Sequence, residues 1–146
     1  KLATIDIPIT LALSLHAPND SLRKELIPWA RFAPIEDILK ACSIYFDATG
    51  REITLEYLLI GGVNDRIAEA KELVSICKTL RCNVNLIRYN EVSELEYERP
   101  KSSQVRRFQE TLTKAGVNVH IRASRGRDIS AACGQLKREQ SKNITG

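Results

Sequence analysis

Apolar residues occur along the chain in two alternating patterns, short continuous runs and helical spacing, and this alternation predicts the fold class. Short apolar runs rich in β-branched residues indicate buried strands. The predicted strands span residues 7–15, 53–60, 83–87 and 117–122. Between them, apolar residues spaced three and four apart indicate amphipathic helices. The predicted helices span residues 21–26, 35–46, 67–80, 105–115 and 129–136.

Strands that alternate with helices favour a parallel sheet, because each crossover helix returns the chain to the same end of the sheet. The pattern fits an α/β fold, an arc of a parallel TIM-like β/α barrel with about four strands and outer helices. A small doubly wound sheet fits the same order. In both architectures, functional residues follow the carboxyl ends of the strands. The segments to expect at the site are therefore 14–16, 61–64, 85–90 and 122–127.

Composition and charge narrow the class of protein. The chain of 146 residues is 43% hydrophobic and 27% charged, which excludes a disordered or coiled-coil protein. Residues 1–98 carry 11 Lys and Arg against 15 Asp and Glu, whereas residues 99–146 carry 11 against 3. The basic carboxyl-terminal third predicts a polyanionic partner, with nucleic acid as the first candidate and a solvated basic tail as the alternative.

The chain contains no Met and begins at Lys1, which predicts a portion of a longer or processed protein. Its apolar runs are shorter than the roughly 18 residues of a membrane helix, and its first residues lack a secretory signal. We therefore expect a cytoplasmic protein without a membrane partner. The cysteines show no CxxC spacing, which argues against a zinc knuckle.

Several polar residues near the predicted strands are candidates for chemistry. His16 follows the first strand, where it fits a base, a ligand contact or a hydrogen-bonded loop residue. Asn85 and Asn90 fit the recognition of a ribose, an adenine edge or a carboxylate, or a turn. Glu56 lies within an apolar strand, so it either faces a barrel interior or pairs with an Arg. Cys133 has small neighbours and follows a basic cluster, which favours a reactive thiolate, with a buried structural cysteine as the alternative.

Three stretches carry a family resemblance: LSLHAPND at 13–20, VNLIRYN at 84–90 and RGRDISAACGQL at 125–136. Together they resemble the carboxyl-terminal half of the radical-SAM RNA methyltransferases that methylate carbon 2 of adenosine in large-subunit rRNA and, in some members, in tRNA. A related branch methylates carbon 8. The resemblance runs over nearly the whole chain in order, and ACGQL is its most specific element.

The resemblance implies a site at the matching positions. It implies that Ser14, Leu15, His16 and Asn90 contact S-adenosylmethionine, and that the sulfur of Cys133 becomes methylated. In this family a second S-adenosylmethionine is cleaved by a reduced [4Fe-4S] cluster. The radical formed takes a hydrogen atom from the methyl group, and the resulting carbon radical adds to adenine. An electron donor for the cluster is implied as well.

The chain also departs from the family pattern. It has no CxxxCxxC motif, so we expect the cluster ligands in an upstream part and no metal ligand in this chain. Arg88 and Glu91 stand where the family usually has proline, which alters the loop around Asn90. Asn64 and Asp65 follow the second strand and are expected to cap the next helix.

These observations predict a domain layout and a function. We expect residues 1–136 to be the carboxyl-terminal part of a radical-SAM barrel domain, with a basic RNA-facing segment at 99–136 and a flexible basic tail at 137–146. The RNA contacts expected in this segment are Arg122, Arg125 and Arg127. The predicted function is methylation of rRNA or tRNA by the full-length enzyme, with the isolated chain inactive. The alternative is a non-catalytic module that binds RNA or completes a partner chain.

Overall fold

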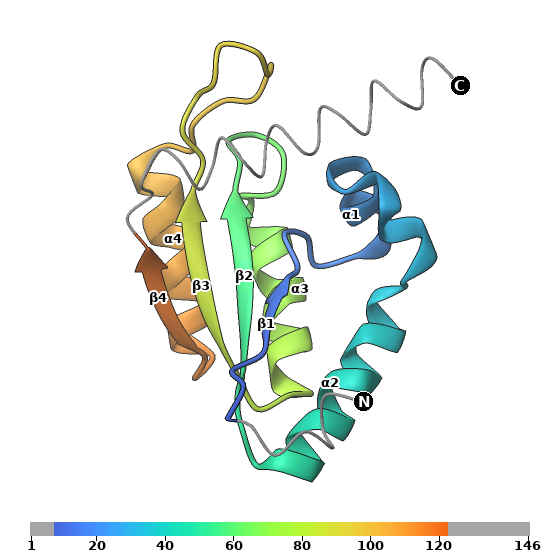
Figure 1. The fold of residues 1–146 in the computed structure, drawn as a ribbon. Coiled ribbons are helices and arrows are strands. Elements are labelled where there is room, and N and C mark those ends of the chain that lie inside the picture. Colours follow the sequence, from blue (N-terminus) through green and yellow to red (C-terminus); the bar gives the residue numbers. More distant parts are fainter. Residues whose placement is uncertain (1–7, 123–146) are drawn as a thin grey trace, which may run out of the picture.

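The structure, a computed structural model, describes residues 8–122. Five predicted features lie outside the described residues: the helix 129–136, the tail 137–146, Arg125, Arg127 and Cys133. Figure 1 shows the order of the described elements: β1 (Ala12–Ser14), α1 (Asp20–Leu26), η2 (Pro28–Phe32), α2 (Ile35–Thr49), β2 (Ile53–Leu59), α3 (Ile67–Lys78), β3 (Cys82–Arg88), α4 (Ser102–Lys114) and β4 (Asn118–Arg122). The 3-10 helix η2 is absent from the predicted set, and it begins at a proline that cannot continue α1.

The four strands form one sheet in the order β1-β2-β3-β4, and every pairing is parallel. This confirms the predicted α/β class. Consecutive strands are neighbours, and α2, α3 and α4 lie in the crossovers between them (Figure 1). Helix α2 ends at Gly50, whose φ of 67° is the left-handed conformation that glycine adopts readily at a helix end.

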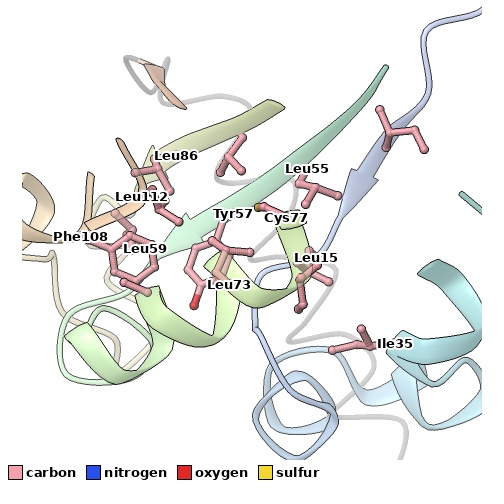
Figure 2. Close-up of a cluster of buried hydrophobic side chains, with 14 of the residues drawn as sticks. Leu15, Ile35, Leu55, Tyr57, Leu59, Leu73, Cys77, Leu86, Phe108 and Leu112 are labelled. Carbon is pink, nitrogen blue, oxygen red and sulfur yellow. The ribbon is translucent and has the colours of Figure 1, made fainter. Parts of the chain in front are cut away.

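The side chains of one sheet face form the main core. Because successive strand residues point to opposite faces, Leu55, Tyr57 and Leu59 of β2 share this face, and all three are buried. They pack with residues of α3 and α4 (Figure 2). The Tyr57 and Phe108 rings lie 5.3 Å apart between centroids, a favourable distance for aromatic contact. The helices therefore cover this face.

The opposite face of the sheet is mostly polar. The pairing register places β-strand residues side by side in rows, and paired residues project from the same face. We call this the polar face, and its polar members are Ser14, Thr54, Glu56, Asn83, Asn85, Asn118, His120 and Arg122. A polar sheet face inside an α/β fold provides hydrogen-bonding groups for a ligand.

Strand β1 is shorter than the predicted strand at 7–15. Among the described residues, the prediction of a strand before residue 12 is wrong. The carbonyl oxygen of Ile9 accepts hydrogen bonds from the Tyr45 hydroxyl at 2.6 Å and from Arg51 at 3.4 Å. Side chains thus occupy an acceptor that a longer strand would use. Pro8 in addition has no N–H to donate to a neighbouring strand.

A second apolar cluster lies at the carboxyl ends of the strands. Leu58 and Ile60 at the end of β2 pack there with buried residues of α1, η2 and the loop after β3. Ile87 of β3 is half-buried against the same cluster. This cluster fixes the loops that carry the predicted site residues onto the sheet.

Candidate functional site

The chain turns sharply after β1, and this turn presents the first predicted site residues. The backbone N–H groups of Leu15 and His16 both donate to the carbonyl oxygen of Glu56, at 3.0 and 3.3 Å. His16 has a φ of 57°, a left-handed conformation that is uncommon for a residue other than glycine. Ser14 stays exposed on the polar face, whereas the Leu15 side chain is buried in the main core.

The His16 imidazole is held as a neutral ring. The N–H of Leu58 donates to its Nδ1 at 3.0 Å, so the ring proton lies on Nε2. Burial, followed by the positive charge of Arg23, lowers the pKa of His16 from 6.5 to about 4. Because Nδ1 accepts from Leu58, the Nε2–H of the neutral ring is the donor that His16 can offer to a ligand at physiological pH.

We expect this imidazole to make the protein less stable in acid. The unfolded imidazole titrates near 6.5 and the folded one near 4, so only the unfolded chain binds the extra proton between these values. The free energy of unfolding should fall by up to about 3 kcal/mol as the pH decreases through this window. His16→Asn keeps an acceptor for the Leu58 N–H and tolerates a left-handed φ, but does not titrate. Urea denaturation of both proteins from pH 7 to 4 tests this, and parallel pH profiles would contradict it.

A buried arginine holds the turn after β1 in place through hydrogen bonds. Arg23 of α1 is 2% exposed, and its guanidinium donates to the carbonyl oxygens of Leu15 at 3.3 Å and Ala33 at 3.2 Å. Burial lowers its pKa, and nearby Asp20 opposes this shift. Arg23 therefore ties the turn after β1 to the end of η2.

The loop after β2 is locked to the same turn by Asn64. This side chain is fully buried, and its Nδ2 donates to the carbonyl oxygens of His16 at 2.8 Å and Leu58 at 2.7 Å. Its Oδ1 accepts from the N–H of Ile60 at 2.8 Å. The prediction that Asn64 and Asp65 cap the next helix is wrong, because Arg66 is the cap residue of α3.

The polar residues of the LSLHAPND stretch have structural roles. Asn19 is the N-cap of α1, and its side chain accepts from the Leu22 N–H at 2.9 Å. The Asp20 carboxylate accepts from the N–H of Ile35 at 2.9 Å, which joins α1 to the start of α2. The stretch thus builds the turn that displays Ser14 and His16.

Asn90 lies just beyond β3, on a segment that is fixed by its neighbour. Tyr89 is fully buried, its N–H donates to the carbonyl oxygen of Leu59 at 3.0 Å, and its ring meets that of Tyr97 edge-on. Gly61 forms an isolated bridge with Glu98 from the same long loop. A Cβ at Gly61 would lie 2.9 Å from a carbonyl oxygen of that loop, so only glycine allows this approach.

The polar face contains one ion pair that bears on the sequence predictions. Arg122 at the end of β4 lies 3.9 Å from a carboxylate oxygen of Glu56 on β2. Glu56 therefore pairs with an arginine, as one of the two alternatives predicted, and it projects from the polar face. The Arg122 side chain remains 56% exposed.

The structure brings Ser14, His16 and Asn90 to one end of the sheet, after β1 and β3 on either side of β2. It also reveals two supporting residues, Arg23 and Asn64, whose roles the sequence reasoning missed. Arg23 has no sequence signal, since it looks like an exposed arginine in a short polar helix. Asn64 has a weak one, because it follows a buried strand in a glycine-rich loop.

Comparison with known proteins shows which proteins the chain is similar to. No protein-family model matches the chain. The chain is 48% identical over 142 residues to the "Probable dual-specificity RNA methyltransferase RlmN" of Alkaliphilus oremlandii, which covers 97% of the chain and 41% of that protein. The chain is homologous to a portion of the RlmN methyltransferases. The protein with the same description in Rhodopirellula baltica is 47% identical over 140 residues, covering 96% of the chain and 38% of that protein.

Solved structures agree with the RlmN match. A radical SAM methyltransferase from Sphaerobacter thermophilus superimposes with a TM-score of 0.84 at 46% identity, over 92% of the chain and 39% of that structure. A domain of a pyruvate-formate lyase-activating enzyme from Bacteroides vulgatus shares the fold, with a TM-score of 0.64 at 20% identity. The chain spans about 40% of the length of its RlmN relatives.

The radical SAM family implies S-adenosylmethionine and an iron-sulfur cluster, and the described residues fit only the first. Within residues 8–122, no group of three or more His, Cys, Asp or Glu side chains is arranged to hold a metal. Burial raises the pKa of the Cys42 thiol, and hydrogen bonding with Cys82, followed by burial, raises that of Cys77. Cys82 is half-buried at the start of β3, at the other end of the sheet from His16. These thiols do not form a cluster site.

The polar groups at the carboxyl end of the sheet, in contrast, fit the binding of S-adenosylmethionine. Ser14 offers an exposed hydroxyl, and His16 offers an Nε2–H. Both can donate to acceptor atoms of the ligand, and because neither carries a charge they do not repel its sulfonium cation. As a separate observation, no helix within residues 8–122 is long and apolar enough to cross a membrane.

Proposed function

We propose that this chain is the carboxyl-terminal portion of a radical-SAM RNA methyltransferase that methylates an adenosine of large-subunit rRNA or of tRNA. The observation that carries the proposal is the 48% identity over 97% of the chain to a protein described as an RNA methyltransferase. The placement of Ser14, His16 and Asn90 at one end of a parallel sheet supports it, because ligands of such sheets bind there.

In this proposal, Ser14, His16 and Asn90 contact S-adenosylmethionine. Ser14 and His16 lie on a turn that Arg23 and Asn64 hold rigid, so they are positioned before the ligand arrives. Leu15 contributes its place in the turn, because its side chain is buried and its carbonyl oxygen already accepts from Arg23. The ligands of the iron-sulfur cluster and the site for its electron donor belong to the upstream part of the full-length enzyme.

The RNA would bind to the basic segment at 99–136. Arg122, Arg125 and Arg127 lie in it, and arginines bind phosphate oxygens through charge-assisted hydrogen bonds. Cys133 lies in the same segment and is the residue we propose to carry the methyl group.

The test is product analysis of the full-length protein. We expect incubation with S-adenosylmethionine, a reductant and a fragment of large-subunit rRNA or tRNA to yield methyladenosine in the digested RNA, detected by liquid chromatography and mass spectrometry. Comparison with 2-methyl and 8-methyl standards identifies the carbon. RNA that binds but gains no methyl group would support the non-catalytic binding module instead.

A further inference from the structure

The strand register sets four polar residues side by side across the polar face. Ser14 is paired with Glu56, Glu56 with Asn85, and Asn85 with His120. Neighbouring strands lie about 4.8 Å apart, and paired residues project from the same face. We call this set the polar row. Glu56 therefore stands directly beside Ser14, although the two are far apart in the sequence.

Three side chains of the polar row have hydrogen-bonding groups that no residue within 8–122 occupies. Within residues 8–122, Ser14 and Asn85 show no side-chain hydrogen bond or ion pair. Glu56 is 26% exposed, and its contact with Arg122 is 3.9 Å long. A carboxylate has about four acceptor sites, so this single long contact leaves most of them open. Such polar groups, exposed at Ser14 and half-buried at Glu56 and Asn85, can complete their hydrogen bonds with a ligand.

The next row toward the carboxyl end contains Leu58, Ile87 and Arg122. Leu58 is buried in the second apolar cluster, and Ile87 is half-buried against it. Each residue along a strand advances about 3.3 Å, so the two rows lie about 7 Å apart. The row of acceptors and donors suits the ribose of a nucleoside, which has two hydroxyls, and the half-buried Ile87 lies beside that row as an apolar contact.

We propose that Glu56 is a binding residue for S-adenosylmethionine, with its carboxylate accepting the ribose hydroxyls. This rests on the proposed function, in which the adjacent Ser14 contacts the same molecule. The charge on Glu56 decides between ligands: a carboxylate attracts the sulfonium cation of S-adenosylmethionine and repels RNA phosphates. Asn85, on the other side of Glu56, offers both a donor and an acceptor to the same nucleoside.

Arg122 has a positioning role toward this carboxylate. At 3.9 Å it orients one oxygen of Glu56 by charge, and the distance exceeds that of a hydrogen bond. The carboxylate therefore stays available to the ribose. Loss of Arg122 should weaken ligand binding less than loss of the Glu56 charge.

Equilibrium binding of S-adenosylmethionine to the full-length protein tests the proposal without an activity assay. Glu56→Gln keeps the shape of the side chain and removes its charge, so we expect the Kd to rise about 10-fold. Glu110→Gln, an exposed change on α4 on the helix-covered side, is the matched control and should leave the Kd unchanged. Equal affinity of the Glu56→Gln and Glu110→Gln variants would overturn the proposal.

A second ligand separates direct contact from an indirect effect. The 2′-deoxyribose form of S-adenosylmethionine lacks one hydroxyl, so the unchanged protein should bind it about 10-fold more weakly. Glu56→Gln has a neutral and therefore weaker acceptor, so its affinities for the two forms should differ by less. The comparison on the unchanged protein needs no variant, and equal affinity for the two forms would overturn the proposal. The proposal would also be overturned if Arg122→Gln lost as much affinity for S-adenosylmethionine as Glu56→Gln, and as much of the preference for the ribose form over the 2′-deoxyribose form.

Two further outcomes are distinguishable. If Glu56→Gln binds S-adenosylmethionine normally but binds an rRNA fragment more weakly, Glu56 faces the RNA and this inference fails while the proposed function stands. If the unchanged full-length protein binds no S-adenosylmethionine, both fail together.

Discussion

Cys133→Ala in the full-length enzyme should abolish adenosine methylation while RNA binding stays the same. Under the proposed function, the Cys133 thiolate attacks the methyl carbon of S-adenosylmethionine. A sulfur–carbon bond forms on the protein, the sulfonium–methyl bond breaks, and S-adenosylhomocysteine leaves. Alanine has no sulfur to receive the methyl group, so we expect no methyladenosine by mass spectrometry, even after long incubation.

The matched control for this experiment is Cys82→Ala. Cys82 is also a free thiol, but it lies at the start of β3, away from the carboxyl ends of the strands. We expect this variant to methylate RNA at the rate of the unchanged enzyme. Peptide mapping should find one methyl group on the Cys133 peptide and none on the Cys82 peptide. Full methylation by Cys133→Ala would refute the S-methylcysteine route while leaving RNA methylation itself possible.

Asn64→Ala should destabilise the protein more than any surface change. The buried side chain donates two hydrogen bonds, to the carbonyl oxygens of His16 and Leu58, and accepts one from the N–H of Ile60. Alanine removes the partner of all three backbone groups at a position where the Asn64 side chain is fully buried. We expect the free energy of unfolding to fall by about 3 to 5 kcal/mol, as measured by urea denaturation.

The control for Asn64 is Asn118→Ala on the exposed edge strand β4, which should change stability by less than about 0.5 kcal/mol. Because Asn64 also holds the turn at His16, its loss should weaken S-adenosylmethionine binding as well. Similar unfolding curves for Asn64→Ala and Asn118→Ala would show that the loop after β2 does not depend on these hydrogen bonds.

Periodicity was sufficient to predict the fold because strand and helix patterns differ in their spacing. The alternation of buried residues with Thr54 and Glu56 identifies β2 as a strand with one covered face. The length of β1 could not be predicted, because it depends on side chains of α2 and the loop after it that bond to Ile9. Those contacts join residues that are more than 30 positions apart.

The candidate site residues that follow strand ends could be predicted from the sequence. Those that are brought together by the register of strand pairing could not. Ser14, His16 and Asn90 follow from the rule that parallel sheets bind ligands at their carboxyl ends. That Ser14 stands beside Glu56 requires the pairing of β1 with β2, and the sequence does not encode this alignment in any local pattern. The buried position of Arg23 likewise depends on the packing of α1 against the turn and η2.

The buried thiols of α2 and α3 also provide a built-in reporter of local opening. Cys42 and Cys77 are 3% and 8% exposed, so an alkylating reagent reaches them only when the helices separate from the sheet. In a Cys82→Ala, Cys133→Ala background, their labelling rate would measure the opening of the amino-terminal end of the sheet. A ligand that slows this labelling from the opposite end of the strands would reveal how far its stabilisation spreads through the fold.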